Sequence, residues 1–403
     1  MPNAPAGRRP ANAVLMLTLP PFVGGVSTMA RAAARALASD GFEVVAAHRV
    51  AYAERPDLSV PLWRAPFRRP RLEPWPDSRV GVERFGVGTW LPELEWAHYQ
   101  PWGPWRPLIE SFPRHVVVTG NALPGLGLAR LGLPALNWVA TDFLGDRADR
   151  FRAKPLVRRA YDRVFNRPFC VVAERLALER TDVLALSDHT ARALAAASPR
   201  ARIRGVLRMP VEGLASAPRQ GLRGGRPTIG FAGRLSDPRK NVPLLFAALR
   251  LAAGHLPAIR LRVVGDLTPE LARAMGAADL LERIEFLPPL GPDAMPGFYA
   301  GLDAFAISSH QEGLAIVGLE AMAQGVPVVS TRCGGPEEYV LPGETGLLAG
   351  FDAAELAGAI VAALDERTYP ALSANAWALV RERHGWETFR TGLLERFHAL
   401  HGR

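Results

Sequence analysis

Residues 304–331 read AFAISSHQEGLAIVGLEAMAQGVPVVST, and this stretch decides the fold. Residues 304–308 form an apolar run of strand length, residues 314–324 are predicted to be a helix, and residues 326–331 form a second apolar run. A strand, a glycine-containing turn and a helix that leads to another buried strand make the repeating unit of a parallel sheet. The fold class predicted from this stretch is therefore α/β.

The same alternation extends along the rest of the chain. Further strands are predicted at residues 13–19, 44–47, 115–119, 135–139, 183–186, 228–232, 261–264 and 284–287. Further helices are predicted at residues 242–253, 293–302, 353–364 and 387–400. Residues 212–227, EGLASAPRQGLRGGRP, have the composition of a linker. Two doubly wound domains joined by this linker predict a ligand in the cleft between them, at the carboxyl ends of the strands.

Length and composition are those of a globular protein with two domains. The chain has 403 residues, of which 48% are apolar and 22% are charged. No apolar run reaches the roughly 20 residues that a membrane-spanning helix requires. Residues 13–19 are interpreted as a strand rather than as part of a secretory signal, because no small-residue cleavage site follows. The two cysteines, Cys170 and Cys333, lack metal-ligand spacing and favour a reduced, cytoplasmic protein.

The net charge of +9 is carried almost entirely by arginine, since lysine occurs only at Lys154 and Lys240. The sequence has no zinc-finger spacing and no stacking-aromatic signature, so nucleic-acid binding is not predicted. An anionic nucleotide substrate and an anionic membrane surface both explain the charge.

Two glutamates frame the helix of the opening stretch. Glu312 follows the strand, and Glu320 lies about two turns into the helix, some 12 Å further along its axis at about 1.5 Å per residue. Backbone N–H groups at the helix start form a site for a diphosphate, and the two carboxylates can accept hydrogen bonds from sugar and ribose hydroxyls. The residues predicted to supply those groups are Gly313, Leu314, Ala315 and Ile316. Taken alone, the spacing also fits one surface glutamate and one ordinary helix glutamate.

Two cations bracket the turn that follows the strand at residues 228–232. Residues 230–241 read GFAGRLSDPRKN, with Arg234 after the strand and Lys240 before the next helix. Two fixed cations beside a helix N-terminus stabilise a diphosphate leaving group without a metal ion. A solvated Asp-Pro turn with surface charges is the alternative interpretation of this segment alone.

A third turn, PPFVGGVS at residues 20–27, contains Gly24 and Gly25 after the first strand. Glycines at a helix start allow the backbone to approach a ligand closely, although they also serve tight packing. The turn is not a Gly-x-Gly-x-x-Gly motif, and His48 and Arg49 stand where the second strand of a dinucleotide dehydrogenase would end in an acidic residue. A dehydrogenase is therefore disfavoured.

In this order and spacing, the three segments resemble the retaining glycosyltransferases of family 4. Glu312 and Glu320 match the family's Glu-x7-Glu motif, and AMAQGVPVV at residues 321–329 matches the run that follows it. Arg234 and Lys240 fall on the family's diphosphate-binding pair, and the two glycines fall on its N-terminal glycine loop. The Trp-containing residues 384–387 resemble the segment before the family's C-terminal helix. The resemblance is close over about residues 228–350 and looser elsewhere.

The resemblance implies the GT-B fold, in which two doubly wound Rossmann-like domains face each other across a cleft. Residues 1–211 are expected to bind the acceptor, with a C-terminal helix at about 384–403 packing back on them. Residues 212–227 are expected to link them to residues 228–383, which are expected to bind the nucleotide-sugar.

The resemblance also implies a retaining, metal-independent hexosyltransferase with no cofactor beyond its nucleotide diphosphate-sugar donor. Arg234 and Lys240 are expected to hold the diphosphate, Glu312 the sugar and Glu320 the ribose. Many members of the family carry His-Asp where this chain has ATD at residues 140–142, so only Asp142 matches. Asp142 is a candidate for the acceptor side and, equally, for a helix N-cap. MPVE at residues 209–212 replaces the usual Asn-Gly-Val-Asp.

Two unusual segments bear on the acceptor, which the resemblance leaves open between a glycan, a lipid-linked glycan and a small molecule. Six of the nine tryptophans fall within residues 63–105, a Pro-rich stretch interpreted as an insertion lining the acceptor cleft. Residues 147–180 hold ten Arg or Lys interleaved with apolar residues. Together they predict an amphipathic acceptor and peripheral contact with an anionic membrane at its inner face. A loop packed on the sheet and a solvated basic helix explain the same residues.

Three rival functions remain open on this architecture. A sugar-nucleotide 2-epimerase would release its product without an acceptor. A non-catalytic binding protein would hold the donor without turning it over, although the intact Arg, Lys and paired Glu disfavour it. A phosphorylase would carry a pyridoxal cofactor, visible in an absorbance spectrum.

Overall fold

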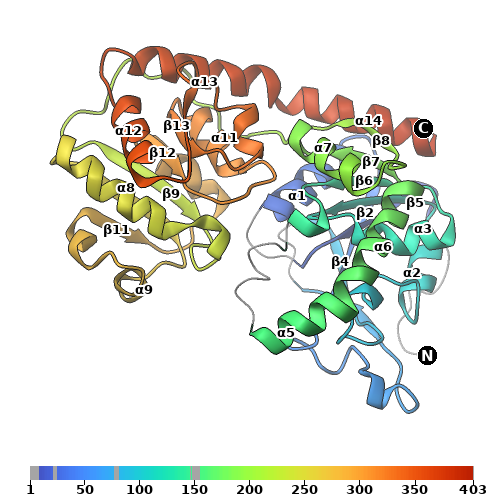
Figure 1. Ribbon diagram of the computed structural model, residues 1–403. Helices are drawn as coiled ribbons and strands as arrows, with labels where there is room; N and C mark the ends of the chain where they lie inside the picture. Colours follow the sequence, from blue (N-terminus) through green and yellow to red (C-terminus); the bar gives the residue numbers. More distant parts are fainter. Residues whose placement is uncertain (1–8, 21–24, 77–80, 146, 148–154, 403) are drawn as a thin grey trace. The chain divides into compact units, whose positions relative to one another are not determined.

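The protein divides into two compact units, seen in a computed structural model (Figure 1). The structure describes residues 9–20, 25–76, 81–145, 147 and 155–402. The N-terminal unit comprises residues 1–208 and 389–403, and the C-terminal unit comprises residues 209–388. Gly24, one of the predicted glycine-loop residues, lies outside the described residues, whereas Gly25 is the first residue of helix α1 (Gly25–Ala38).

The N-terminal unit is built on a sheet in the order β3-β4-β2-β1-β5-β6-β7-β8. All described neighbours pair in parallel except β3 and β4, which are antiparallel. Its strands are β1 (Ala13–Thr18), β2 (Glu43–Arg49), β3 (Leu72–Pro74), β4 (Glu83–Val87), β5 (Arg114–Thr119), β6 (Leu136–Val139), β7 (Asp182–Ala185) and β8 (Ile203–Val206). Its other helices are α2 (Trp105–Glu110), α3 (Leu126–Leu131), α5 (Leu156–Tyr161), the π-helical turn η4 (Asp162–Asn166), α6 (Arg167–Arg180) and α7 (Asp188–Ala197).

The C-terminal unit is built on a fully parallel sheet in the order β11-β10-β9-β12-β13-β14. Its strands are β9 (Thr228–Gly233), β10 (Arg260–Gly265), β11 (Ile284–Leu287), β12 (Ala304–Ile307), β13 (Val328–Thr331) and β14 (Gly346–Ala349). Its helices are α8 (Val242–His255), α9 (Pro269–Ala274), α10 (Met295–Ala300), α11 (Ile316–Ala323), α12 (Ala353–Ala363) and α13 (Tyr369–Arg383).

Both sheets have the strand order of a doubly wound Rossmann fold. In the C-terminal unit the first and fourth strands, β9 and β12, lie side by side at the centre, where the order of the strands reverses. Ligands of such sheets bind at this switch point, beyond the carboxyl ends of the strands. The predicted α/β fold class is confirmed, and the loops that the sequence marked, after β9 and after β12, meet at this point.

Apolar packing on the two faces of the C-terminal sheet holds these strands in place. Helices α8 and α12 lie side by side on one face, as Figure 1 shows, over the alternate buried residues of β9, β10 and β12. Leu245, Phe246 and Leu249 of α8 are almost fully buried, and burial of each contributes roughly 1.5–3 kcal/mol. On the other face the ring of Tyr299 from α10 lies 5.5 Å from that of Phe305 on β12. The sheet therefore offers its terminal loops a rigid base.

Residues 212–227, predicted as a linker, contain no helix or strand but belong to the C-terminal unit. Arg219 accounts for this assignment, because its guanidinium donates hydrogen bonds to the backbone oxygens of Tyr299 (3.2 Å), Ala300 (2.9 Å) and Gln324 (3.1 Å). Its backbone N–H also donates to Ser373 Oγ at 2.8 Å.

The last helix, α14 (Trp386–His401), belongs to the N-terminal unit from Phe389 onward. The ring of Phe389 lies 5.1 Å from that of Trp138 on β6, and the ring of Phe397 lies 5.2 Å from that of Phe42. The sequence predicted a C-terminal helix at about residues 384–403 packing back on the first domain, and α14 begins at Trp386.

The Trp-rich stretch at residues 63–105 differs from the expected insertion. Its middle forms β4, which pairs in parallel with β2, and β3, which pairs with β4 at the edge of the sheet. Of its six tryptophans Trp105 is buried, Trp75, Trp90 and Trp96 are half-buried, and only Trp63 and Trp102 are exposed. Most of these rings therefore pack within the unit, as the alternative interpretation held.

Candidate functional site: the loops after β9 and β12

The loop after β9 positions Lys240 through a short helical turn. Asp237 caps the turn Pro238–Lys240, since its carboxylate accepts a hydrogen bond from the N–H of Arg239 at 3.1 Å and forms an ion pair with the Arg239 guanidinium at 3.0 Å. Gly233 ends β9 with φ +145, and a Cβ atom there would lie 3.3 Å from Lys240 Cε. The lysine side chain thus crosses directly over the end of the strand.

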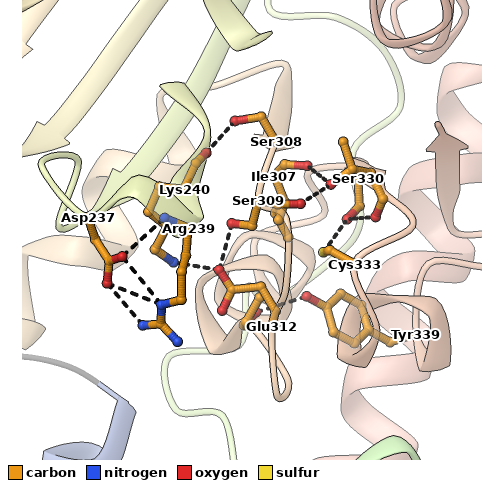
Figure 2. A network of polar contacts seen from close by, with 12 residues as sticks. Asp237, Arg239, Lys240, Ile307, Ser308, Ser309, Glu312, Ser330, Cys333 and Tyr339 are labelled. Carbon is orange, nitrogen blue, oxygen red and sulfur yellow. Dashed lines mark hydrogen bonds and ion pairs between the residues drawn. The ribbon is translucent and has the colours of Figure 1, made fainter. Parts of the chain in front are cut away.

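Lys240 and Glu312 meet in a close ion pair, drawn in Figure 2. The Nζ atom of Lys240 lies 2.7 Å from Oε1 of Glu312, and Ser309 Oγ donates to the same oxygen at 2.6 Å. The side chains of Lys240 and Glu312 are only 17% and 13% exposed. Burial alone would raise the pKa of Glu312, but the charge of Lys240 and the hydrogen bonds from Lys240 and Ser309 outweigh it and hold the pKa below its usual value. The carboxylate is therefore ionised at neutral pH.

Two hydrogen bonds to the main chain of the Lys240 loop hold the two loops together independently of this ion pair. The Oγ atom of Ser308 donates to the carbonyl oxygen of Lys240 at 2.8 Å, and the N–H of His310 donates to that of Arg239 at 2.7 Å. The positions of Lys240 and Glu312 thus follow from the main chain of both loops.

A second pair of backbone contacts presses the Glu312 loop against the segment after β13. The N–H of Glu312 donates to Cys333 O at 2.7 Å, and the N–H of Gly335 donates to Glu312 O at 2.9 Å. A Cβ atom at Gly335 would lie 2.2 Å from Gly313 O, a contact that real structures do not contain. Glycine at residue 335 is therefore required for this approach.

The start of α11 is held in an unusual backbone conformation. Ala315 precedes the helix with φ 54, one of three left-handed non-glycine residues among those that the structure describes. Its carbonyl oxygen accepts a hydrogen bond from the buried hydroxyl of Tyr339 at 2.8 Å. Such strain persists only where the surroundings impose it, and it is common at ligand sites. The predicted residues Gly313, Leu314, Ala315 and Ile316 thus form a tightly shaped turn at the helix N-terminus.

The remaining predicted residues of the C-terminal unit lie apart from the ion pair. Glu320 of α11 is half-buried, and one of its carboxylate oxygens accepts a hydrogen bond from Tyr299 Oη at 2.6 Å. Arg234 lies exposed at the beginning of the loop after β9. The structure therefore brings together Lys240, Glu312 and the start of α11, while the roles of Arg234 and Glu320 stay predictions.

Asp142 lies in the N-terminal unit, just after β6. One of its carboxylate oxygens accepts a hydrogen bond from the N–H of Gly145 at 2.9 Å, the contact that an N-cap makes three residues on. This contact supports the helix-cap interpretation. A role of Asp142 toward the acceptor stays a prediction.

Several residues of the site escaped the sequence reasoning. Ser309, Tyr299 and Tyr339 hold Glu312, Glu320 and Ala315 respectively, and Asp237 orients the lysine turn. Only Asp237, a helix cap before a proline, carried a local signal. The tyrosines act from other elements, so no local pattern marks them.

Neither a metal nor a membrane span is evident in the described part of the chain. No three or more His, Cys, Asp or Glu side chains gather there in a group able to hold a metal ion. No described helix combines the length and the apolar composition needed to cross a bilayer.

Comparisons with known proteins find a matching family for the C-terminal half of the chain. Residues 226–366 match the family described as glycosyl transferases group 1. The D-inositol 3-phosphate glycosyltransferase of Rhodococcus erythropolis strain PR4 is 33% identical over 190 residues, which are 44% of this chain and 42% of that relative. The chain spans about two fifths of the length of the curated relatives it matches.

Two solved structures share the fold over nearly the whole chain. Sucrose-phosphate synthase of Thermosynechococcus elongatus is 20% identical with a TM-score of 0.72, and the likeness covers 96% of this chain and 98% of that one. HepE of Anabaena, solved in complex with UDP-glucose, is 19% identical with a TM-score of 0.70 over 96% of this chain and 100% of that one. With the two Rossmann-like units, these likenesses confirm the predicted GT-B fold class.

The segment that matches the family also contains the candidate site. The matched segment contains both loops, the Lys240–Glu312 ion pair and the start of α11. Residues 226–366 thus match the glycosyl transferases group 1, in agreement with the resemblance found in the sequence of this part of the chain, while the narrower assignment to family 4 stays a prediction.

Proposed function

We propose that the chain is a retaining glycosyltransferase that transfers a sugar from a nucleotide diphosphate-sugar to the hydroxyl of an acceptor. The observation that carries the proposal is the Lys240–Glu312 ion pair at the switch point of the C-terminal sheet, beside the start of α11. A cation beside the N-terminus of a helix suits a diphosphate, and a buried carboxylate suits the hydroxyls of a sugar.

In the proposed reaction the acceptor hydroxyl attacks the anomeric carbon from the face on which the diphosphate departs. A bond forms between the acceptor oxygen and the anomeric carbon, the bond from that carbon to the phosphate oxygen breaks, and the departing phosphate oxygen takes the hydroxyl proton. The protein stabilises the charge that develops on the diphosphate. Lys240 and Arg234 supply positive charge, Glu312 orients the sugar, and Glu320 receives the ribose hydroxyls while Tyr299 holds its other side.

The donor, acceptor and location are further parts of the proposal. HepE was solved with UDP-glucose, so UDP-glucose is the first donor to test. The acceptor is proposed to be amphipathic, either a lipid-linked glycan or an apolar small molecule. D-inositol 3-phosphate, named for the curated relatives, serves as a polar comparison. The protein is proposed to act in the cytoplasm, at the inner face of the membrane, without a metal ion.

The test begins with donor binding, measured as thermal stabilisation by UDP-, GDP- and ADP-sugars, because a ligand stabilises the state that it binds. Transfer is then measured as release of the nucleoside diphosphate, with the anomeric configuration of the product determined by NMR. An inverted product would exclude the retaining mechanism. Conversion of the donor to its 2-epimer without an acceptor would favour the epimerase, and binding without any turnover would favour the binding protein.

A further inference from the structure

Large apolar side chains are exposed mainly in one part of the N-terminal unit. Thirteen such side chains are exposed among the described residues, and ten of them lie between residues 62 and 172. They are Leu62, Trp63, Phe67, Trp102, Leu144, Leu156, Val164, Phe165, Phe169 and Val172. Single exposed apolar residues are ordinary, but a concentration of this kind marks a surface that binds something.

The first group occupies residues 62–69, LWRAPFRR, which we call the aromatic tip. Leu62, Trp63 and Phe67 are 69%, 64% and 84% exposed. The tip is nevertheless ordered by its backbone. The N–H of Arg64 donates to Pro61 O at 2.9 Å and that of Phe67 to Arg64 O at 3.0 Å.

The base of the tip is fixed to the unit. The N–H of Arg71 donates to the carbonyl oxygen of buried Leu58 at 2.9 Å, and the N–H of Val60 donates to Thr89 O at 2.9 Å. The tip is thus a fixed turn that presents its apolar side chains to the surroundings.

The second group lies on the outer face of α5, η4 and α6, which we call the outer helix face. Its exposed members are Leu156, Val164, Phe165, Phe169 and Val172. The side turned to the unit is buried at Asp162, Asn166, Cys170 and Ala173, about one residue per turn. The inner side of the helix therefore already packs against the unit, and packing of the fold does not require apolar residues on the outer face.

A series of contacts leads from the outer helix face to the residue that follows the tip. The ring of Trp96 lies 5.6 Å from that of Phe169 and 6.2 Å from that of Trp102. The next residue, Gly103, would place a Cβ atom 3.5 Å from the ring of Pro70, directly after the tip. Figure 1 shows the segment around η1 (Leu62–Arg64) and helix α5 both at the lower edge of this unit.

The charges of this surface identify its partner. The aromatic tip contains three arginines and no acidic residue, and residues 155–172 contain four arginines and one acid, the buried Asp162. The guanidinium of Arg64 lies 4.1 Å above the ring of Trp63, and Arg68, Arg69, Arg163 and Arg167 are exposed. Aromatic and aliphatic side chains mixed with arginine suit the boundary of an anionic bilayer, where the rings enter the headgroup layer and the guanidinium groups meet lipid phosphates.

We propose that the aromatic tip and the outer helix face together bind an anionic lipid bilayer, with Trp63 and Phe67 inserted into the headgroup region. The inference deepens the proposed function, which has an amphipathic acceptor at a membrane, and it assigns the contact to specific residues. Binding itself requires neither donor nor turnover.

The test is sedimentation of the full chain with vesicles of phosphatidylcholine, with or without phosphatidylglycerol, at physiological salt. The wild type is expected to sediment with the anionic vesicles and to remain in solution with neutral ones. The double variants Trp63→Ser/Phe67→Ser and Arg68→Gln/Arg69→Gln are each expected to lower the partition coefficient at least about tenfold. Val164→Ser/Val172→Ser tests the outer helix face in the same way.

Leu251→Ser is the matched control, because Leu251 is a 47% exposed apolar residue on α8 of the C-terminal unit. The Leu251→Ser variant should sediment with the vesicles as the wild type does. Thermal melting of each variant checks that it folds. No sedimentation of the wild type, or tip variants that bind as it does, would overturn the proposal. So would lipid-free self-association that the tip variants abolish. Turnover of UDP-glucose with a soluble acceptor, measured in parallel, tests the proposed function separately.

Discussion

Replacement of Lys240 by alanine is the most direct test of the site, because two consequences follow from one contact. The lysine Nζ lies 2.7 Å from Glu312 Oε1, and both side chains are largely buried. At an effective dielectric constant of about 20 their attraction is several kcal/mol, but desolvation offsets most of it. Lys240→Ala is expected to cost about 1–3 kcal/mol of folding stability, because it leaves the buried Glu312 carboxylate without its ion-pair partner. The variant should therefore melt several degrees lower.

The loss of turnover is expected to be larger than the loss of stability explains. Lys240 would stabilise charge on the leaving diphosphate, and loss of such a contact lowers the rate at least about a hundredfold, or about 2.7 kcal/mol at 1.36 kcal/mol per tenfold change. The assay is release of nucleoside diphosphate under conditions in which the variant is fully folded. Activity within a fewfold of wild type under those conditions would remove Lys240 from the mechanism.

A double variant separates the two consequences. Lys240→Ala/Glu312→Gln removes the uncompensated charge and should recover most of the lost stability, while turnover stays low. Recovered turnover would show that Lys240 only neutralises Glu312. Arg250→Ala is the matched control, because it breaks an ion pair with Asp279 that is about half exposed and should leave turnover and melting nearly unchanged.

Three further predictions concern the same unit. Turnover in excess EDTA should equal that in magnesium, because in the proposed mechanism Arg234 and Lys240 supply the positive charge, and an absolute metal requirement would contradict that mechanism. The pKa of Glu312 is lower in the folded protein than in the unfolded chain, so the ionised carboxylate stabilises the folded state. This stabilisation is complete above the unfolded-state pKa of about 4.3 and is lost as the pH falls through the folded-state pKa. Urea unfolding between about pH 5 and 3 should therefore show a steeper loss for the wild type than for Glu312→Gln, and parallel curves would argue against the ion pair. Gly335→Ala should destabilise the unit by roughly 1–3 kcal/mol and reduce donor binding, because the added Cβ atom would lie 2.2 Å from Gly313 O. A normal Tm together with normal donor binding would show that glycine is not required at residue 335.

The fold of the C-terminal unit was largely predictable from its sequence. Its buried parallel strands are continuous apolar runs, and β11 was predicted at its observed bounds of Ile284–Leu287. The glycine turns after β9 and β12 lie between a strand and a helix, so the alternation predicted them at the carboxyl ends of strands, whereas the strand order that makes β9 and β12 neighbours is seen only in the structure. The resemblance to family 4 assigned Lys240 and Glu312 to one site, and the structure brings them together in an ion pair.

What the sequence did not reveal depends on contacts between distant residues. Glu320 is held by Tyr299, which lies 21 residues earlier on another helix, and Ala315 is held by Tyr339 from beyond β13. In the N-terminal unit the short strands β3 and β4 lie in a Trp- and Pro-rich stretch and contain Pro74, Arg84 and Gly86, which do not predict strands. Pairing of β4 with β2, and of β3 with β4, places both in the sheet despite their composition.

The hydrogen bonds to the main chain of the loops after β9 and β12 decide how substitutions there can be interpreted. The main chain of the Lys240 loop is bonded to Ser308 and His310, and that of the Glu312 loop is bonded to Cys333 and Gly335. None of these bonds uses the side chain of Lys240 or Glu312. The turn at Ala315 is likewise held through its carbonyl oxygen, by Tyr339. A substitution at Lys240 or Glu312 therefore removes a charge from loops whose main chain has other supports, so its kinetic effect measures the charge rather than a collapse of the site.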